Sequence, residues 1–152
     1  MILTYEDSLQ SPTVQLLKQK NIFGKGFGGG VAHLSGAIFL LEESIKPNSK
    51  WKNYIGVLPT DWSSFPFTYT NEDMSWLEGS TVKEHTYIMQ QAMLRQYILI
   101  SDNIPDFGSK FSFFEFSKMY RVGTSRTFKL MMGSNKDEES TCYIPYVDLF
   151  NH

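Results

Sequence analysis

The sequence is poor in the residues that most often build a metal site or a disulfide. It has one cysteine, Cys142, and three histidines among 152 residues. A single cysteine excludes an internal disulfide and a cysteine-based zinc site, and it agrees with a reducing compartment. His33 and His85 lack a second metal-type ligand at helical spacing, so we expect them to be packed or solvated. We therefore expect no metal, and a small buried thiol at Cys142.

The sequence also lacks charge of one dominant sign and any long apolar run. Fourteen basic and 16 acidic side chains give a formal net charge of -2, and they are scattered. No basic patch indicates binding to nucleic acid or to an anionic membrane. The first residues, "MILTYEDSLQ", have no basic region, and no stretch approaches about 18 apolar residues. We expect neither nucleic acid nor membrane as a partner, and a cytoplasmic or nuclear location.

Aromatic residues, in contrast, are abundant. They make up 15% of a chain that is 41% hydrophobic, which favours a packed core over disorder. The length corresponds to about one domain. Trp51, Trp62 and Trp76 are widely spaced and have prolines nearby, so we interpret them as core anchors rather than as a ligand cage.

A glycine-rich stretch, "NIFGKGFGGGVAHL", places Gly24, Gly26 and Gly29 on the G-x-G-x-x-G spacing of a dinucleotide-binding turn. Such a turn needs a buried strand before it, a helix after it, and an acid about 20 residues further on. The preceding "LLKQKNIF" is polar and helical in pattern, and Glu42 and Glu43 fall within the next expected helix. A connector is the favoured interpretation, and a nucleotide-binding oxidoreductase is a less favoured alternative.

Capping residues and apolar spacing predict a mainly helical middle of the chain. "MILTY" is expected to be the end of a strand, and "FKLMM" and "TCYIPYVDL" to be two strands around the polar "GSNKDEES". "SDNIPDFGSK" is expected to be a loop. Helices are expected from Ser8 or Ser11-Pro12 to the glycines, over 31–45, in a short turn before Pro59, from Thr70 or Asn71 to Leu77, from 81 to about 100, and after the capping box of Ser112 and Glu115.

The last third of the chain carries the most informative polar residues. "SFFEFSKMYRVGTSRTF" is followed, about twenty residues later, by "YIPYVDLFNH". Local chemistry says that Arg126 and Asp148 can pair, and that Asn151 and His152 lie at a strand end. Ser125 has neither a G-x-S-x-G context nor a nearby histidine, which disfavours a nucleophilic triad.

Four segments of the chain resemble one known family when they are taken in order. "ILTYEDS" is similar to its "LLxT" strand end, and "AIFLLEESIKPNSKWKNYIGVLPTDWSSFPFTYTNEDMSWLEGS" to its helical insert. "FEFSKMYRVGTSRTF" is similar to its "V.SR.F" segment, and "IPYVDLFNH" to its "P..D..NH" motif. In their order and spacing these segments resemble the SET-domain protein methyltransferases of the Rubisco large-subunit lysine methyltransferase type, which include the actin-histidine branch.

The resemblance implies an α+β partial SET fold, with short β-strands at both ends and a large, mainly helical insert. It divides the chain into the end of the N-terminal SET strands (1–7), the insert (8–125) and the start of the C-terminal SET part (126–152). The implied activity is S-adenosylmethionine-dependent protein-lysine N-methylation, in which the enzyme mainly aligns the reactants.

The resemblance also assigns site residues. Arg126, Asn151 and His152 are expected to contact S-adenosylmethionine. Asp148, Arg126 and Phe128 are expected at the substrate, and Phe128 favours a lysine target over a histidine.

The chain departs from the family in ways that bear on activity. Lys118-Met119 replaces the usual Trp-Ala. By the family pattern, a cofactor-binding G-x-G segment should precede Met1, and the catalytic tyrosine of the channel should follow His152. We therefore expect a fragment that binds the cofactor weakly and does not turn over. The alternative is a non-catalytic SET-like module that binds a protein partner.

Overall fold

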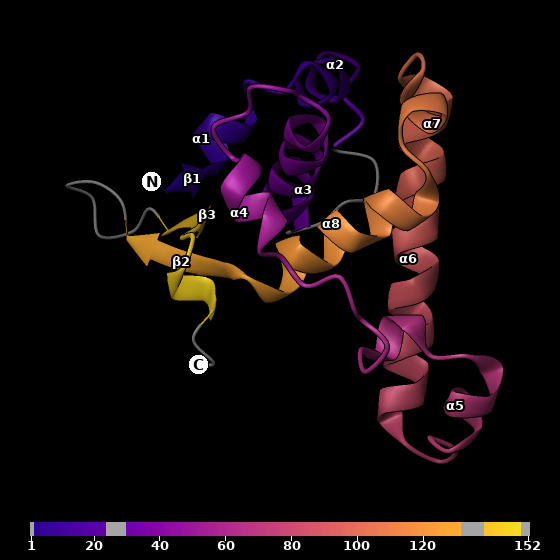
Figure 1. Cartoon of the computed structure of the whole chain (residues 1–152). Helices are drawn as coiled ribbons and strands as arrows, with labels where there is room; N and C mark the ends of the chain where they lie inside the picture. The colour runs from indigo at the N-terminus through magenta and orange to yellow at the C-terminus, as the bar shows by residue number, and fades with distance from the viewer. Residues whose placement is uncertain (1, 24–29, 132–138, 150–152) are drawn as a thin grey trace.

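The computed structural model describes residues 2–23, 30–131 and 139–149. Its elements are mostly helices, with short strands toward the two ends of the chain (Figure 1). In chain order they are β1 (Leu3–Thr4), α1 (Tyr5–Ser8), α2 (Pro12–Gln19), α3 (Val31–Ser44), α4 (Lys52–Gly56), η2 (Pro66–Thr68), α5 (Asn71–Ser75), α6 (Thr81–Asn103), α7 (Phe107–Lys110), α8 (Phe113–Ser125), β2 (Thr127–Met131), β3 (Glu139–Tyr143) and η3 (Val147–Leu149).

The three described strands form one antiparallel sheet in the order β1-β3-β2. Leu3 lies opposite Tyr143, and Phe128 lies opposite Cys142. The sheet therefore joins segments from the two ends of the sequence, and Figure 1 shows helix α8 leading from it to the long helix α6 at the opposite side of the molecule. The expected α+β class, with strands contributed by both ends, is confirmed.

Capping side chains set most helix starts, as the sequence predicts. Each accepts a hydrogen bond from a backbone N–H in the first turn, which satisfies a donor that the helix itself leaves free. Two of the predicted caps, Thr70 and Ser112, are full capping boxes, in which the third helical residue bonds back to the cap. Ser11 rather than Ser8 caps α2, Thr70 rather than Asn71 caps α5, and Ser80 and Ser112 cap α6 and α8 as predicted.

Three expected elements differ from the structure. Residues 101–110 are not a loop, because α6 continues to Asn103 and α7 follows, anchored by the buried Phe107. The first strand stops at Thr4, because Thr4 and Asp7 form a capping box that starts α1. The last strand stops at Tyr143, and after Tyr146, whose φ is 71°, residues Val147–Leu149 form a 3-10 turn.

The tryptophans divide between core and surface. Trp51 and Trp62 are 1% and 7% exposed, which confirms their role as core anchors. Trp76 is 84% exposed, so that prediction is wrong for it. Trp76 directly follows the five-residue helix α5, which is too short to bury residues on more than one side.

Helix α3 is the centre of the core and is buried almost all round, as expected. One side of it packs with α8, α6 and α7 in an aromatic cluster that includes Ile38, Phe107 and Phe116. The other side packs with the sheet and α4, where Leu40, Trp51 and Tyr143 belong to a second cluster. Among the described helices, none combines the length and the hydropathy that a bilayer span requires.

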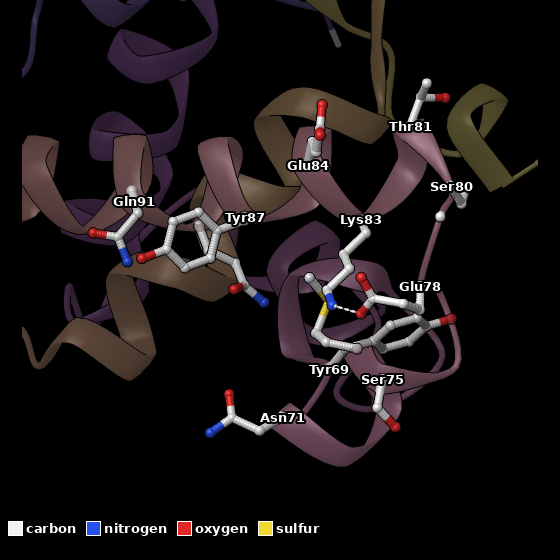
Figure 2. Close-up of a pocket in the computed structure, with 13 residues that line it drawn as sticks. Tyr69, Asn71, Ser75, Glu78, Ser80, Thr81, Lys83, Glu84, Tyr87 and Gln91 are labelled. Atoms are coloured by element: carbon white, nitrogen blue, oxygen red, sulfur yellow. Dashed lines mark hydrogen bonds and ion pairs between the residues drawn. The ribbon is translucent and has the colours of Figure 1, made fainter.

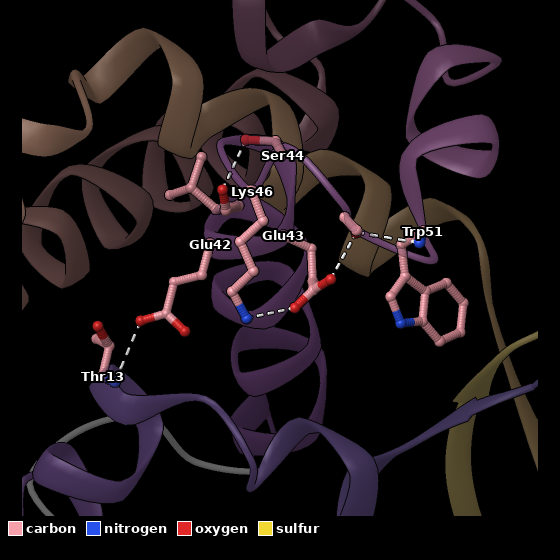
Figure 3. Close-up of polar contacts among 8 residues, drawn as sticks. Thr13, Glu42, Glu43, Ser44, Lys46 and Trp51 are labelled. Carbon is pink, nitrogen blue, oxygen red and sulfur yellow. Dashed lines mark hydrogen bonds and ion pairs between the residues drawn. The ribbon is translucent and has the colours of Figure 1, made fainter.

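Polar contacts fasten the end of α3 to its neighbours (Figure 3). The Glu43 carboxylate accepts hydrogen bonds of 2.5 Å from Lys46 Nζ and from Ser49 Oγ. Ser49 Oγ also accepts a bond of 3.0 Å from the Trp51 backbone N–H. Burial alone would raise the pKa of Glu43, but the bonds from Lys46 and Ser49 bring its pKa below the ordinary value. This carboxylate therefore helps to position Trp51 in the core.

Two helical glycines make room for a buried tyrosine of the sheet. A Cβ on Gly36 of α3 would lie 2.3 Å from the Tyr143 ring, and one on Gly123 of α8 would lie 2.9 Å from Tyr143 Oη. That hydroxyl donates a bond of 3.1 Å to the His33 carbonyl oxygen. Tyr143 thus fits a notch between α3 and α8, and it fixes the sheet against both helices.

Candidate functional site

A buried carboxylate, a guanidinium and a phenol meet beyond the start of β2 and the end of β3. Asp148 lies in η3, Arg126 lies between α8 and β2, and Tyr54 lies in α4. Tyr54 Oη donates a hydrogen bond of 2.6 Å to Asp148 Oδ2. Arg126 Nη1 lies 3.6 Å from the same oxygen and donates a bond of 2.9 Å to the Asp148 backbone carbonyl. The predicted pairing of Arg126 with Asp148 is confirmed.

This site is well shielded from solvent. The Asp148 side chain is fully buried, and that of Arg126 is 18% exposed. The second carboxylate oxygen, Asp148 Oδ1, is buried and has no hydrogen-bond partner among the described residues. A buried acceptor without a donor is costly, by about 1–3 kcal/mol. The site is therefore chemically suited to a ligand that supplies a hydrogen-bond donor or a positive charge.

Tyr54 is the member of the site that sequence reasoning missed. Burial raises its pKa far above the ordinary value, and the hydrogen bond to Asp148 raises it further. The phenol consequently keeps its proton and acts as a fixed donor. The ring packs edge-on against Trp51, with centroids 6.2 Å apart. A signal was present in the sequence, because Ser49, Trp51 and Tyr54 match the "S.W..Y" portion of the insert pattern.

The other predicted site residues are only partly placed. Phe128 lies in β2, two positions after Arg126, and is half-buried. Asn151 and His152 lie outside the described residues, so their predicted contacts with the cofactor stay predictions. The substrate roles of Asp148, Arg126 and Phe128 also stay predictions.

His33, His85 and Cys142 lie as the sequence predicts. His33 Nδ1 lies 2.8 Å from the Gly123 carbonyl oxygen and 2.9 Å from Thr127 Oγ1, so His33 is packed where α8 passes into β2. His85 is exposed. Cys142 is a free, buried thiol, and burial raises its pKa. Within residues 2–23, 30–131 and 139–149, no group of three or more His, Cys, Asp or Glu side chains is arranged to hold a metal ion.

The nucleotide-binding alternative gains no support from the structure. Gly24, Gly26 and Gly29 lie outside the described residues. The segment before them forms helix α2, over Pro12–Gln19, where a dinucleotide turn needs a strand. In the part of the chain that the structure describes, every strand pairing is antiparallel. A parallel βαβ unit, which this alternative requires, is therefore not among the described elements.

Comparison with solved structures identifies the fold as part of a SET domain. The whole chain aligns with a third of a protein solved as the SET domain of LSMT bound to lysine and AdoHcy, with a TM-score of 0.74 and 19% identity. A second structure, of the same SET domain bound to methyl-lysine and AdoHcy, aligns equally fully, with a TM-score of 0.73 and 21% identity.

Comparison with curated proteins points to the same class. The chain is 26% identical over 130 residues to the chloroplastic [fructose-bisphosphate aldolase]-lysine N-methyltransferase of Arabidopsis thaliana. This alignment covers 82% of the chain and 26% of the Arabidopsis protein. The chain is also 27% identical over 124 residues to the chloroplastic Rubisco large-subunit N-methyltransferase of Pisum sativum. That alignment covers 78% of the chain and 24% of the pea protein. No protein-family model matches the chain. The resemblance to SET-domain lysine methyltransferases is confirmed, and the chain spans about a quarter of the length of these relatives.

Proposed function

We propose that this chain supplies part of an S-adenosylmethionine-dependent protein-lysine N-methyltransferase. The observation that carries the proposal is the buried cluster of Tyr54, Asp148 and Arg126. The cluster brings together Arg126, to which the resemblance assigns contacts with the cofactor and the substrate, and Asp148, to which it assigns contact with the substrate. The support from relatives is that their names state lysine or Rubisco methylation, and that the similar solved structures contain lysine or methyl-lysine with AdoHcy.

The chemistry of the cluster agrees with this proposal. When bound, the cofactor supplies a methyl group on a positively charged sulfonium. Arg126, Asn151 and His152 are the residues proposed to hold it. Asp148 contributes a negative charge and a free acceptor oxygen in a dry environment, where such a group interacts strongly with a cation or a donor. Tyr54 and Arg126 fix the orientation of that carboxylate.

Binding of S-adenosylhomocysteine tests the cofactor part of the proposal. We expect weak, saturable binding to the 152-residue chain by titration calorimetry. Arg126→Ala should weaken it by about tenfold or more, because a hydrogen bond to a charged group contributes about 1.5–3 kcal/mol. Arg126→Lys keeps the charge and should have an intermediate effect, and Arg95→Ala, at an exposed position of α6, should have none. A folded chain without saturable binding would contradict the proposal.

Turnover needs a separate test, because we expect the isolated chain to be inactive. The matching segment of the pea enzyme can be replaced by this chain, and methylation of the Rubisco large subunit measured with labelled S-adenosylmethionine. The proposal expects methylation by the chimera and none by the isolated chain. A chimera that folds and binds S-adenosylhomocysteine but transfers no methyl group would count against a catalytic role, and turnover by the isolated chain would overturn the expected inactivity.

A further inference from the structure

An open groove lies between α5 and the first half of α6, outside the site described above. Its volume is about 820 Å³. Figure 1 places this part of the molecule on the side away from the sheet, and Figure 2 shows side chains from α6 on one side of the groove and from the α5 region on the other. It is lined by Tyr69, Asn71, Met74, Ser75, Glu78, Gly79, Ser80, Thr81, Lys83, Glu84, Tyr87, Gln90 and Gln91.

The walls combine aromatic rings with neutral hydrogen-bonding groups. Tyr69 and Tyr87 lie on opposite sides of the groove in Figure 2, and the buried Met74 forms part of its lining. Asn71 and Gln91 supply amides that can both donate and accept. Tyrosines and small polar groups of this kind are typical of surfaces that bind peptides and proteins, since they offer contact area at a low entropy cost.

The charge of the groove is negative. Its single cation, Lys83, forms an ion pair with Glu78. Glu84 takes part in no ion pair among the described residues. Residues 69–91 contain four carboxylates and one lysine, a formal charge of -3, whereas the whole chain carries -2, so the other 129 residues carry +1. The lining itself holds Glu78, Glu84 and Lys83, a formal charge of -1, and the other two carboxylates of the segment, Glu72 and Asp73, lie in the first turn of the adjoining helix α5.

The segments that form the groove also carry exposed apolar side chains. Trp76 is 84% exposed at the end of α5, and Tyr87 and Ile88 of α6 are 59% and 62% exposed. An anionic ligand would meet the free carboxylate of Glu84, and a nucleic acid would meet the net negative charge of the whole segment.

We propose that the groove between α5 and α6 binds an extended, basic segment of a protein partner. Lysine or arginine side chains of the partner pair with Glu84 and pack against the faces of Tyr69 and Tyr87. Its backbone hydrogen-bonds to the amides of Asn71 and Gln91. This inference goes beyond the proposed methyl transfer and does not depend on it, because no residue of the groove belongs to the cluster around Asp148.

A titration followed by ¹H–¹⁵N NMR tests the proposal on the 152-residue chain. The probe is acetyl-Ala-Lys-Ala-Arg-Ala-Lys-Ala-amide, and its counterpart with glutamate at the three charged positions is the control. We expect saturable shifts confined to residues 69–91 with the basic peptide and none with the acidic one. Shifts spread over the surface, or equal responses to both peptides, would overturn the proposal.

Variants make the test specific. Glu84→Lys should weaken the binding of the basic peptide by about fivefold, since an exposed ion pair contributes up to about 1 kcal/mol. Tyr87→Ala should weaken it by a similar factor. Asp102→Lys changes the net charge equally but lies at the far end of α6, about 27 Å from Glu84 along the helix, so it should have little effect. If Glu84→Lys and Asp102→Lys reduced the affinity for the basic peptide equally, only the net charge would matter, and the proposal of a specific site would be overturned.

The outcome is separable from that of the proposed function. Loss of peptide binding in Tyr87→Ala with unchanged binding of S-adenosylhomocysteine supports a groove that is independent of the cofactor site. If the chain binds S-adenosylhomocysteine but does not bind the basic peptide, the proposal for the groove is refuted and the methyltransferase proposal is unaffected.

Discussion

Replacing Gly36 by alanine places a methyl group where the ring of Tyr143 now lies. The new Cβ would be 2.3 Å from Tyr143 Cε2 and 2.7 Å from Oη, whereas carbon atoms in contact normally lie about 3.5–4.0 Å apart. The ring would have to move by more than about 1 Å. It is only 2% exposed, and its strand is paired on both sides, so it has little room to move.

The size of the effect follows from three contributions. Overpacking a core costs about 1–3 kcal/mol, and disturbing the bond from Tyr143 to the His33 carbonyl costs about 1 kcal/mol more. The higher helix propensity of alanine stabilises the helix by up to about 1 kcal/mol and offsets part of this loss. We expect Gly36→Ala to lower the free energy of unfolding by about 2 kcal/mol, which corresponds to a decrease in Tm of roughly 4–8 °C for a chain of this length.

Urea unfolding followed by circular dichroism measures this change, with Gly56→Ala as the matched control. Gly56 ends α4 and has no atom within 4 Å of an added Cβ, so alanine there should be neutral or slightly stabilising. In a Tyr143→Leu background the added methyl has more space, and the cost of Gly36→Ala should shrink by 1 kcal/mol or so. The same loss in both backgrounds, or equal stability of the two alanine variants, would refute the reasoning.

Two further predictions concern buried polar groups. Tyr54→Phe removes the donor to Asp148 and should lower the free energy of unfolding by about 1–3 kcal/mol, whereas Tyr87→Phe, at an exposed position, should change it little; comparable values in urea titrations would contradict this. The lowered pKa of Glu43 means that its stabilising effect is complete above its ordinary pKa near 4.5 and is lost as the pH falls through the lower pKa of the folded state. The stability difference between the wild type and Glu43→Gln, measured from pH 7 to pH 3, should therefore decrease toward low pH, and a constant difference would show that Glu43 acts only by packing.

Local signals made much of the fold predictable. The starts of α2, α5, α6 and α8 follow from single caps or capping boxes, whose effect is confined to one helical turn. The buried character of α3 follows from its apolar residues on all sides. The loop predicted for residues 101–110 is wrong. Pro105 and Gly108 are typical of loops, but the burial of Phe107 and Phe111 in the core holds much of the segment in helical form.

The site was predictable only where residue chemistry is explicit. Arg126 and Asp148 carry opposite charges, which predicts their pairing. Tyr54 is 94 positions away from Asp148 in the sequence, and no local pattern states that a phenol will donate to that carboxylate. The groove at α5 and α6 was also missed, because it depends on how a short helix folds back along a long one. Its acidity was hidden by a net charge near zero for the whole chain.

The pairing of Leu3 with Tyr143 has a consequence for how this protein can vary in length. That contact closes a loop of about 140 residues, and the entropy of closing so large a loop grows only with the logarithm of its length. Adding 20 residues between the two strands, for example at the tip near Gly79, would raise the cost of closure by only about 0.1 kcal/mol. The segment that carries the acidic groove can therefore be lengthened, shortened or exchanged with almost no penalty to the strand pairing, which leaves its binding surface free to diverge while the sheet stays constant.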